Sequence, residues 1–330
     1  MDSFRALVVD KQGDETALQI REMTPDQLMP GEVTIRVEYS SINYKDGLAT
    51  TAGGNVARTY PLVIGIDLAG EVVEGSGAGF KPGDKVLAHG YDIGVAHHGG
   101  LAEVARLPAG WVVPLPAGLT TRQAMAIGTA GFTAAMSVEA LEHMGVLPGQ
   151  GPVLVTGASG GVGSTAVSLL TGRGFEVAAS TGSPDNHDYL RSLGASELVD
   201  RAETTAASSR PLEKARWAGG VEAVGGASLA YLLRTTRIGG SIALSGNAGG
   251  AALESTVYPF ILRGISLVGI DSANMALDRR TKLWQRLAAD LRPPKLDESI
   301  ACEIELDEAP EALARILRGE LRGRTVVRLP

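Results

Sequence analysis

A glycine-rich turn between an apolar segment and a helical segment constrains the fold of this chain more than any other feature. Residues 151–163 read Gly-Pro-Val-Leu-Val-Thr-Gly-Ala-Ser-Gly-Gly-Val-Gly. The apolar run Val153 to Thr156 predicts a buried parallel strand, and the pattern that follows predicts a helix from Ser164 to Arg173. Gly160 and Gly163 match the second and third glycines of the pattern G-x-G-x-x-G. This order of strand, turn and helix favours a dinucleotide-binding site over a turn that is only structural.

Each glycine of this turn has a physical role. Gly160 lets the backbone approach a pyrophosphate with no side chain in between, and Gly163 lets the helix pack closely on the strand. The N-terminus of the helix offers unpaired N–H groups and a partial positive charge to the anion. Ala158 stands in place of the first glycine of the pattern. We therefore expect the cofactor to contact Ser159, Gly160, Gly161 and Val162.

The end of the second predicted strand bears on the choice of cofactor. Dinucleotide sites that take NAD carry an acidic residue there for the ribose 2′-hydroxyl. In this chain the strand Phe175 to Ser180 is followed by Thr181, Gly182 and Ser183. These small residues can accommodate a 2′-phosphate, whereas a carboxylate would repel it, so we predict NADP(H). Arg191, on the following helix, is the candidate for the missing positive charge; the alternative is that it lies on a solvated helix face.

Composition and charge narrow the class of protein. The 330 residues are 44% hydrophobic and 20% charged, which is typical of a globular protein long enough for two domains. A formal net charge of −7 without a run of Lys or Arg argues against nucleic acid as a partner. Since no basic segment followed by an apolar run opens the chain and no uninterrupted apolar stretch of about 18 residues occurs, we predict a cytoplasmic protein without membrane association. The single cysteine, Cys302, lies in a predicted strand from Ser299 to Leu306 and allows no internal disulfide.

The first part of the chain, to about Leu119, consists of short alternating segments with frequent Gly and Pro between them. Such dense turn signals predict a partly open β-barrel. The expected strands are Ala6 to Asp10, Glu32 to Ser40, Ala69 to Glu74, Lys85 to Ala88 and Leu101 to Arg106. At the other end of the chain, Thr325 to Pro330 is typical of a strand, and we expect it to rejoin this barrel.

The pattern changes at Thr120, where a capping box with Gln123 begins a helix that we expect to reach Met144, with a break near 128–131. Strands and helices then alternate, which predicts a doubly wound parallel sheet. The expected elements are strands at 175–180, 197–199, 221–224, 241–244 and 266–270 and helices at 186–193, 212–217 and 228–234. We predict a catalytic domain at residues 1–122, an NADP-binding domain at 123–270 and a return to the catalytic domain at 271–330.

A barrel first, a nucleotide-binding domain second and a chain end that returns to the barrel resemble the medium-chain dehydrogenase/reductase superfamily. The resemblance implies an α/β protein with a GroES-like catalytic domain and a Rossmann sheet. Zinc-dependent members carry Gly-His-Glu and a lobe with four cysteines. Here the corresponding segment is Gly65-Ile-Asp-Leu-Ala-Gly70, with Asp67 at the position of a zinc ligand, and the cysteines are absent. The resemblance thus implies a reaction that proceeds without a metal.

Within the zinc-free branch, the chain resembles the acryloyl-CoA reductase family, whose members are also named quinone oxidoreductases. The likeness spans nearly the whole chain, and Asn43-Tyr-Lys-Asp46 together with Gly65-Ile-Asp67 are its most specific parts. The similar stretches are Ser41 to Asp46, Pro61 to Gly70, His97 to Glu103, Ile127 to Thr133, Gly157 to Ser164, Asp188 to Ala195, Pro259 to Arg263, Gly269 to Ser272 and Gly323 to Thr325. The chain departs from the family pattern at Ser183, where a basic residue is frequent, and at His98, where an aromatic residue is common.

The chemistry that the resemblance implies is addition of a hydride to the β-carbon of an α,β-unsaturated thioester. Such a reaction requires positioning of the two carbons, hydrogen-bond donors for the enolate oxygen and a proton for the α-carbon. The resemblance implies that Asn43, Asp46, Asp67 and Arg324 face one another and that Tyr44 lies near the nicotinamide. Each of these residues also has a structural interpretation. Asn43 and Asp46 could cap a helix, Tyr44 could be a core aromatic residue, and Asp67 could form a buried salt bridge with Arg324.

Further contacts with the cofactor are expected where the strands of the parallel sheet end, because ligands of open α/β sheets bind there. In addition to the turn residues above, the resemblance implies contacts at these ends from Thr129, Val224, Gly225, Ser245, Gly246, Asn247, Ile270, Asp271 and Ser272. It also implies contacts from Tyr44 and Arg324, which lie outside the parallel sheet.

Three functions are compatible with these residues. The first is NADPH-dependent reduction of acryloyl-CoA, or of a similarly short enoyl-CoA, to the saturated thioester. The second is reduction of a quinone or an enone with the same hydride donor, and the third is nucleotide binding without catalysis. Lys45, Arg58 and Arg263 are candidates for the CoA phosphates, between which the sequence does not choose.

The histidines and one apolar strand give two further structural expectations. His89, His97 and His98 lie in glycine-rich loops without metal-ligand partners, so we interpret them as structural, with His97 a candidate for the rim of the pocket. The apolar strand Ile265 to Ile270 is expected at the edge of the nucleotide-binding sheet, where it would need to be covered. We therefore predict a homodimer.

Overall fold

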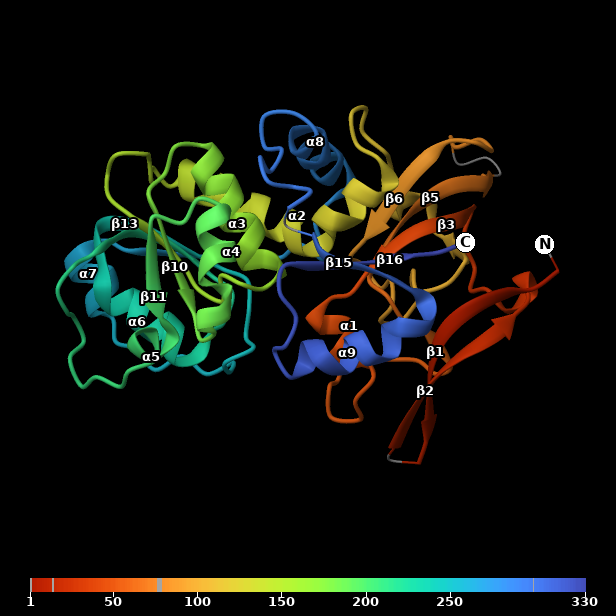
Figure 1. Cartoon of the computed structure of the whole chain (residues 1–330), viewed down its shortest axis with the longest axis horizontal. Helices are drawn as coiled ribbons and strands as arrows, with labels where there is room; N and C mark the ends of the chain where they lie inside the picture. Colours follow the sequence, from red (N-terminus) through yellow and green to blue (C-terminus); the bar gives the residue numbers. More distant parts are fainter. Residues whose placement is uncertain (1, 14, 76–78, 299) are drawn as a thin grey trace. The chain divides into compact units, whose positions relative to one another are not determined.

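The computed structural model describes residues 2–13, 15–75, 79–298 and 300–330 (Figure 1). The chain forms two compact units, which we describe separately. Unit 1 comprises residues 1–129, 273–289 and 300–330, and unit 2 comprises residues 130–272 and 290–299. The segment 290–299 therefore packs with unit 2, although the sequence places it with the catalytic domain. The division into domains at 1–122, 123–270 and 271–330 stays a prediction.

Unit 1 is built on a seven-stranded sheet and a three-stranded sheet. In the order of pairing, the larger sheet contains β15 (Ile300–Glu305), β16 (Arg324–Arg328), β3 (Val33–Ser41), β5 (Asp67–Glu74), β6 (Lys85–His89) and β8 (Val112–Pro114), and β7 (Val104–Leu107) pairs with β3. The smaller sheet contains β2 (Glu15–Met23), β1 (Phe4–Gln12) and β4 (Leu62–Val63). β2 pairs along the whole of β1 and was not predicted from the sequence.

The end of the chain returns to this sheet, as predicted. β16 pairs antiparallel with β3, with Val326 opposite Ser41, and β15 pairs parallel with β16 (Figure 1). Ser299, the first residue of the strand predicted around Cys302, lies outside the described residues. The other helices of unit 1 are α1 (Tyr44–Ala49), α8 (Leu277–Leu287) and α9 (Ala309–Leu317). The methyl group that an alanine would place at Gly47 in α1 would lie 2.9 Å from Leu317 Cγ, so α1 packs closely on α9.

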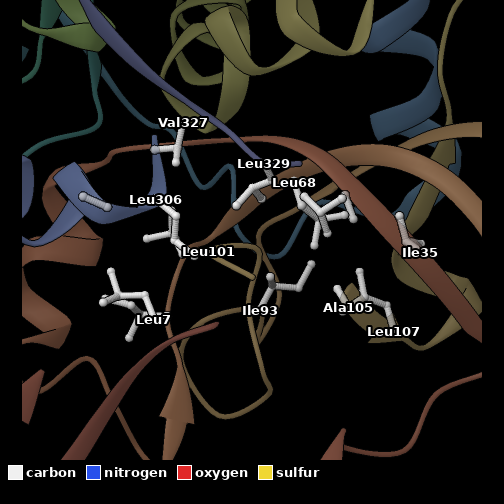
Figure 2. Packing of buried hydrophobic residues seen from close by; sticks show 14 of the residues in the cluster. Leu7, Ile35, Leu68, Ile93, Leu101, Ala105, Leu107, Leu306, Val327 and Leu329 are labelled. Atoms are coloured by element: carbon white, nitrogen blue, oxygen red, sulfur yellow. The ribbon is translucent and has the colours of Figure 1, made fainter. Parts of the chain in front are cut away.

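An apolar core holds the strands of unit 1 together. Figure 2 shows side chains from β1, β3, β5, β7 and β16 gathered in it, among them Leu7, Ile35, Leu68, Leu107 and Val327, each with 0% exposure. Full burial of a residue of this size stabilises the fold by about 1.5–3 kcal/mol. The alternation of inward apolar residues along short strands, from which the barrel was predicted, is the local cause of this core.

Unit 2 contains a six-stranded sheet in which all pairs are parallel. The strand order is β11 (Glu197–Asp200), β10 (Val177–Thr181), β9 (Val153–Val155), β12 (Trp217–Glu222), β13 (Thr236–Leu244) and β14 (Ser266–Gly269). The helices are α3 (Gly161–Gly172), α4 (His187–Ser192), α5 (Arg201–Thr204), α6 (Gly226–Thr235) and α7 (Tyr258–Arg263). The chain starts at β9 in the middle, proceeds to one edge and then to the other, which confirms the predicted doubly wound sheet.

One predicted helix of unit 2, at 212–217, is wrong. Trp217 begins β12 and is fully buried, and the residues just before it have no regular structure. The backbone N–H groups of Glu213 and Arg216 donate to the carbonyl groups of Arg234 and Thr235, at 3.0 and 2.7 Å. Because these donors bond to the end of α6, a helix cannot form here.

The long helix α2 (Thr121–His143) breaks at Gly128, as predicted, and the boundary between the two units falls just beyond the break. Gly128 has φ 51° and ψ −164°, a conformation that residues with side chains rarely adopt. By length and composition α2 could cross a membrane, but 83% of its apolar window is buried, as in the core helix of a globular protein.

Candidate active site

A cluster of buried polar side chains, joined by the partly buried Thr129 of α2, lies at the adjacent ends of three strands in unit 1. We call Ser41, Asn43, Asp67, Thr129 and Arg324 the Asp67–Arg324 network. Asn43 Nδ2 donates to Asp67 Oδ2 at 2.9 Å, and Arg324 Nη1 donates to Asn43 Oδ1 at 3.1 Å. Arg324 Nη2 lies 3.4 Å from Asp67 Oδ2. The pairing of β3 with both β5 and β16 brings these residues together from distant parts of the chain.

The guanidinium of Arg324 is saturated by the protein. Its Nε donates to the carbonyl of Ala126 at 3.1 Å, and its Nη1 and Nη2 also reach the carbonyls of Ile42 and Met125, each at 3.4 Å. Nη2 further donates to Ser41 Oγ at 2.7 Å. A guanidinium has five N–H groups, so none remains for a substrate. Arg324 can position its neighbours, but it cannot itself donate to a reacting oxygen in this arrangement.

Asp67 is the anionic partner in this network. Its carboxylate accepts from Ser41 Oγ at 2.6 Å and from Thr129 Oγ1 at 2.5 Å, and the Thr129 N–H donates to both oxygens. Burial alone would raise the pKa of Asp67, but the charge of Arg324 and these hydrogen bonds hold the pKa below its usual 3.8. Asp67 is therefore ionised at neutral pH, and the predicted buried salt bridge exists.

Asp46 lies beside this network but has a different role. Its two oxygens accept from the backbone N–H groups of Asn43 and Ile66, at 2.9 and 2.8 Å. The first bond satisfies a free donor at the start of α1, so the capping interpretation of Asp46 describes its contacts. Complete burial, together with the nearby charge of Asp67, raises the pKa of Asp46 to about 7.

Tyr44 differs from the other four predicted catalytic residues. It is the first residue of α1 and is 38% exposed, so it is not a core aromatic residue. Among the residues that the structure describes, none forms a hydrogen bond with its hydroxyl group. Tyr44 is thus the member of the predicted set with an O–H group free to meet a substrate.

Two contributors to the network were not among the predicted site residues. Ser41 is the first residue of the similar stretch Ser41 to Asp46, but a serine near the end of a strand has no distinctive pattern that indicates a role. Gly128 was expected only as a helix break, but a Cβ atom there would lie 2.5 Å from both Arg324 Nη2 and Asp67 Oδ2. A glycine at the break in α2 is therefore what allows the helix to approach the salt bridge.

In unit 2, the glycine turn has the geometry of a cradle for a dinucleotide. Gly160 is the N-cap of α3, and a Cβ atom on Gly163 would lie 2.3 Å from the carbonyl oxygen of Gly157. Any side chain at Gly163 would push α3 away from the turn. Ser159 Oγ and Thr181 Oγ1 lie 3.3 Å apart, which links this turn to the end of β10.

The ends of β12 and β13 complete this edge of the sheet. A Cβ atom on Gly246 would lie 2.0 Å from the carbonyl oxygen of Ala223, so the two loops are in close contact. The hydroxyl group of Ser245 is buried and has no hydrogen-bond partner in the part of the chain that the structure describes. An orphaned donor in a glycine-lined cradle fits a polar ligand such as a nicotinamide dinucleotide.

Glu222 supports these loops and was not predicted. Its carboxylate accepts from the N–H groups of Val224 and Gly225, at 2.7 and 2.8 Å, and from Ser228 Oγ at 2.9 Å. Burial raises the pKa of Glu222. The signal in the sequence was a carboxylate at a strand end two residues before a predicted cofactor contact.

The remaining predicted residues are placed as follows. Asn247 follows the Ser245–Gly246 turn, Ile270 and Asp271 follow β14, and Thr133 Oγ1 donates to Ser272 Oγ at 2.8 Å. Arg191 forms an exposed ion pair with Asp188 at 3.6 Å, and no contact with residues 181–183 is found for it in the described chain.

The three histidines interpreted as structural do make contacts within the protein. His89 accepts from Trp284 Nε1 at 2.9 Å. His97 Nε2 contacts the carbonyl of Pro30 at 3.0 Å, and His98 Nδ1 accepts from the N–H of Val63 at 3.2 Å.

Comparison with known proteins identifies the family. Residues 29–117 match the alcohol dehydrogenase GroES-like domain, and residues 161–289 match the family described as zinc-binding dehydrogenase. The chain is 51% identical over 326 residues to acrylyl-CoA reductase AcuI of Ruegeria pomeroyi, with 98% of each chain covered. The chain belongs to the acryloyl-CoA reductase family of the medium-chain dehydrogenases/reductases. The GroES-like and Rossmann parts of the predicted fold are thereby confirmed.

Two further proteins to which this chain is similar bear on the cofactor. The yhdH oxidoreductase from Salmonella enterica, whose crystal structure is in complex with NADP, is 46% identical, with a TM-score of 0.95 and 99% of this chain and 100% of that chain covered. YhfP of Bacillus subtilis, named a quinone oxidoreductase, is 48% identical over 326 residues, with 99% of each sequence covered. Its crystal structure has NAD bound, with a TM-score of 0.96 and 100% of both chains covered.

For this member of the acryloyl-CoA reductase family, we expect Asp46 to make stability depend on pH. The folded pKa of about 7 lies above the ordinary 3.8, so the folded state binds more protons between these values. The free energy of unfolding contributed by Asp46 should therefore be largest below pH 3.8 and fall as the pH rises towards 7. Urea unfolding of the wild type and of Asp46→Asn across this range measures the effect.

The wild type must be compared with Asp46→Asn because His89 changes the stability with pH in the opposite direction to Asp46. Burial lowers the pKa of His89 to about 3, and its contribution cancels in the difference. The wild type should lose more stability than Asp46→Asn as the pH rises, even if the variant is less stable throughout. Asp188→Asn, at a fully exposed carboxylate, serves as the control and should change nothing. Equal pH dependence in the wild type and in Asp46→Asn would contradict the prediction.

Proposed function

We propose that the protein is an NADPH-dependent acryloyl-CoA reductase. In this reaction acryloyl-CoA, NADPH and a proton give propanoyl-CoA and NADP⁺. The observation that carries the proposal is the hydroxyl of Tyr44, which has no hydrogen-bond partner among the described residues. Tyr44 is 38% exposed and lies at the start of a helix that the Asp67–Arg324 network holds in place. The likeness to AcuI over nearly the whole length of both chains supports the choice of substrate.

In the proposed mechanism, Tyr44 donates a hydrogen bond to the thioester oxygen, where negative charge develops. Asn43, Asp46, Asp67 and Arg324 are positioning residues, because the protein already satisfies their polar groups. Asp46 holds the first turn of α1, and the Asp67–Arg324 network holds Asn43 just before Tyr44. NADPH, when bound, supplies the hydride that is added to the β-carbon.

We further propose that unit 2 is the NADP-binding domain and unit 1 the catalytic domain. Ser159 to Val162 and the N-terminus of α3 would hold the pyrophosphate, and Thr181 to Ser183 would surround the 2′-phosphate. The hydroxyl group of Ser245, the backbone of Val224 and Gly225 and the segment from Ile270 to Ser272 would contact the remainder. We also propose that Thr129 and Tyr44 contact the cofactor. Arg324 would affect the cofactor through the neighbouring residues that it holds in place.

The contacts of Lys45, Arg58 and Arg263 differ, and they decide which of these residues can bind the CoA phosphates. Arg263 Nη1 donates to the carbonyls of Arg234 and Thr236, at 2.8 and 2.9 Å, and Nη2 donates to that of Glu213. These hydrogen bonds to the backbone give the guanidinium of Arg263 a structural role. Arg58 is exposed, and its 3.8 Å contact with Asp92 is a weak ion pair, while Lys45 is half-buried beside Tyr44. We propose Lys45 and Arg58 as the residues that meet the CoA phosphates.

The test offers acryloyl-CoA, crotonyl-CoA and a benzoquinone to the enzyme with NADPH. NADPH oxidation is followed by absorbance, and the thioester product is identified by mass spectrometry. The proposal requires propanoyl-CoA from acryloyl-CoA, with inhibition by free CoA. The name of YhfP favours the quinone as the second candidate acceptor. Turnover of the benzoquinone without any turnover of acryloyl-CoA would replace the first function by the second.

We also propose a homodimer, since an apolar surface of unit 2 lies uncovered. β14 is an edge strand, and Val257, Ile261 and Leu262 in and before α7 are 64%, 66% and 61% exposed. An open edge beside such side chains is typical of a surface that associates with a second copy. Light scattering at micromolar concentration should give the mass of a dimer.

A charged substitution tests which surface associates. Ile261→Glu should shift the protein towards the monomer, because it places a charge on the apolar surface. Leu147→Glu, at a residue that is 50% exposed elsewhere in unit 2, should leave the dimer unchanged. A monomeric wild type would refute the dimer.

We also propose a cytoplasmic location, because a chain with one cysteine suits a reducing compartment.

A further inference from the structure

A cavity in unit 2 is lined mainly by positively charged side chains. It lies between the segment that joins α5 to β12 and the second half of α6, and its volume is about 970 Å³. A cavity of this size is large enough for a small organic ligand. Its charged lining consists of five cations and two glutamates, although the whole protein has a formal net charge of −7. The cations are Arg210, Lys214, Arg216, Arg234 and Arg237.

The two glutamates pair with two of these arginines. Glu203 Oε1 accepts from Arg216 Nη1 at 2.7 Å, and Arg216 also pairs with Glu197. Glu213 Oε1 accepts from Arg234 Nε at 3.0 Å. The negative charges of the lining are therefore compensated within the wall of the cavity. They repel an incoming anion less than free carboxylates would.

The other three cations have no carboxylate in contact. Arg210 and Lys214 are exposed, and neither side chain forms a hydrogen bond or a salt bridge with any residue that the structure describes. Arg237 Nη1 donates to the carbonyl of Gln150 at 2.6 Å, and its guanidinium likewise has no salt bridge within the described ranges. Because like charges around one cavity repel one another, an anion that enters it would relieve an unfavourable interaction.

The wall of the cavity is held in place by the protein itself. The backbone N–H groups of Glu213 and Arg216 donate to the end of α6, and Arg234 Nη2 donates to the carbonyl of Ala206 at 3.1 Å. The guanidinium of Arg216 lies over the ring of Trp217, 4.1 Å from its centroid. A wall that is ordered before a ligand enters lowers the entropic cost of binding.

The cavity is separate from the cradle at the glycine turn. Arg216 and Arg237 lie at the starts of β12 and β13, whereas Val224 and Ser245 follow the ends of the same strands. The two ends of the six-residue strand β12 are about 17 Å apart. The residues that line the cavity include none of those proposed to hold NADP(H). An anion in this cavity would therefore be a second ligand.

We propose that this cavity is a second binding site, for a small anion that carries more than one phosphate group. Arginine donates two parallel hydrogen bonds to a phosphate, and lysine supplies a compact positive charge. Phosphate groups joined in a chain contact several separate cations at once, which a single phosphate does not. A free polyphosphate and a nucleotide share this chemistry, and the experiment distinguishes between them. The proposal goes beyond the reductase function and does not depend on it.

Calorimetric titration with pyrophosphate, ATP and inorganic phosphate, with and without saturating NADP⁺, tests this site. Saturation with NADP⁺ keeps the dinucleotide cradle occupied. We expect pyrophosphate or ATP to bind in both conditions, and about tenfold or more tightly than inorganic phosphate. Arg210→Ala and Lys214→Ala should each weaken this binding by about tenfold to a hundredfold, as expected for the loss of a hydrogen bond to a charged group. Both residues are exposed, so the fold should persist in both variants.

Lys295→Ala is the matched control, because Lys295 is another exposed lysine of unit 2 and does not line the cavity. It should leave every affinity unchanged. Binding of ATP would support a nucleotide as the ligand, and binding of pyrophosphate without ATP would support a free polyphosphate. The proposal would be overturned if neither bound at millimolar concentration, if inorganic phosphate bound as tightly, or if binding occurred only without NADP⁺. Unchanged affinity in both Arg210→Ala and Lys214→Ala, or an equal loss in Lys295→Ala, would also overturn it.

Discussion

Arg324→Ala is expected to lower the free energy of unfolding by about 3–5 kcal/mol, the usual effect of removing one partner from a buried ion pair. The substitution would leave Asp67 ionised, 0% exposed and without its guanidinium, and it would remove one donor from each of the carbonyls of Ile42, Met125 and Ala126. Each unsatisfied buried acceptor adds to the loss. Urea unfolding followed by tryptophan fluorescence measures the change.

The same strand offers a matched control for this experiment. Arg328 lies four residues further along β16, where it pairs with exposed Glu305, and Arg328→Ala should change stability little because solvent screens that pair. Arg324→Lys should fall in between, since it keeps the charge but cannot make the forked contacts with Ser41 and Asn43. If Arg324→Ala were no more destabilising than Arg328→Ala, the buried network would not have the structural role that we assign to it.

Tyr44→Phe is expected to lower kcat for acryloyl-CoA by about 100- to 1000-fold, the range found when one donor to a developing oxyanion is removed. The substitution removes a hydroxyl without a partner among the described residues and leaves the aromatic ring in place. The affinity for NADPH should remain unchanged, because the ring and the contacts of unit 2 are retained. Steady-state kinetics and a separate NADPH titration distinguish these two effects.

A second tyrosine controls for loss of a phenol as such. Tyr258, 45% exposed on α7, lies in unit 2, and Tyr258→Phe should leave turnover unchanged. A loss in Tyr44→Phe that appears only in KM would indicate that the hydroxyl binds substrate without acting on the transition state. Unchanged kcat and KM in Tyr44→Phe would remove Tyr44 from the mechanism.

Much of unit 2 could be predicted from short segments. The glycine spacing of residues 151–163 and the alternation of strands and helices predicted a doubly wound sheet, and the structure has it. The break in α2 was visible as a cluster of glycines. The predicted helix at 212–217 failed because its backbone donors bond to the end of α6, a partner that no local pattern reveals.

The sequence predicted which residues lie at the candidate site, but not which of them have polar groups free for a substrate. Asn43, Asp46, Asp67 and Arg324 do meet in unit 1, yet their polar groups are satisfied by the protein, and only Tyr44 retains a free donor among the described residues. Residue type alone could not show this. Whether an arginine acts on a substrate or on its own fold depends on how many acceptors surround it.

The parallel sheet of unit 2, the returning C-terminal strand and the identity of the polar residues at the site could be predicted from the chain alone. These follow from hydrophobic period, glycine spacing and motif, which are properties of neighbouring residues. Which charges are free depends on the folded chain. Ser41 and Arg324 are 283 positions apart, and Glu203 pairs with Arg216 but not with nearby Lys214. Hydrogen bonds and charges act through distance in space, so their effect appears only once the chain is folded.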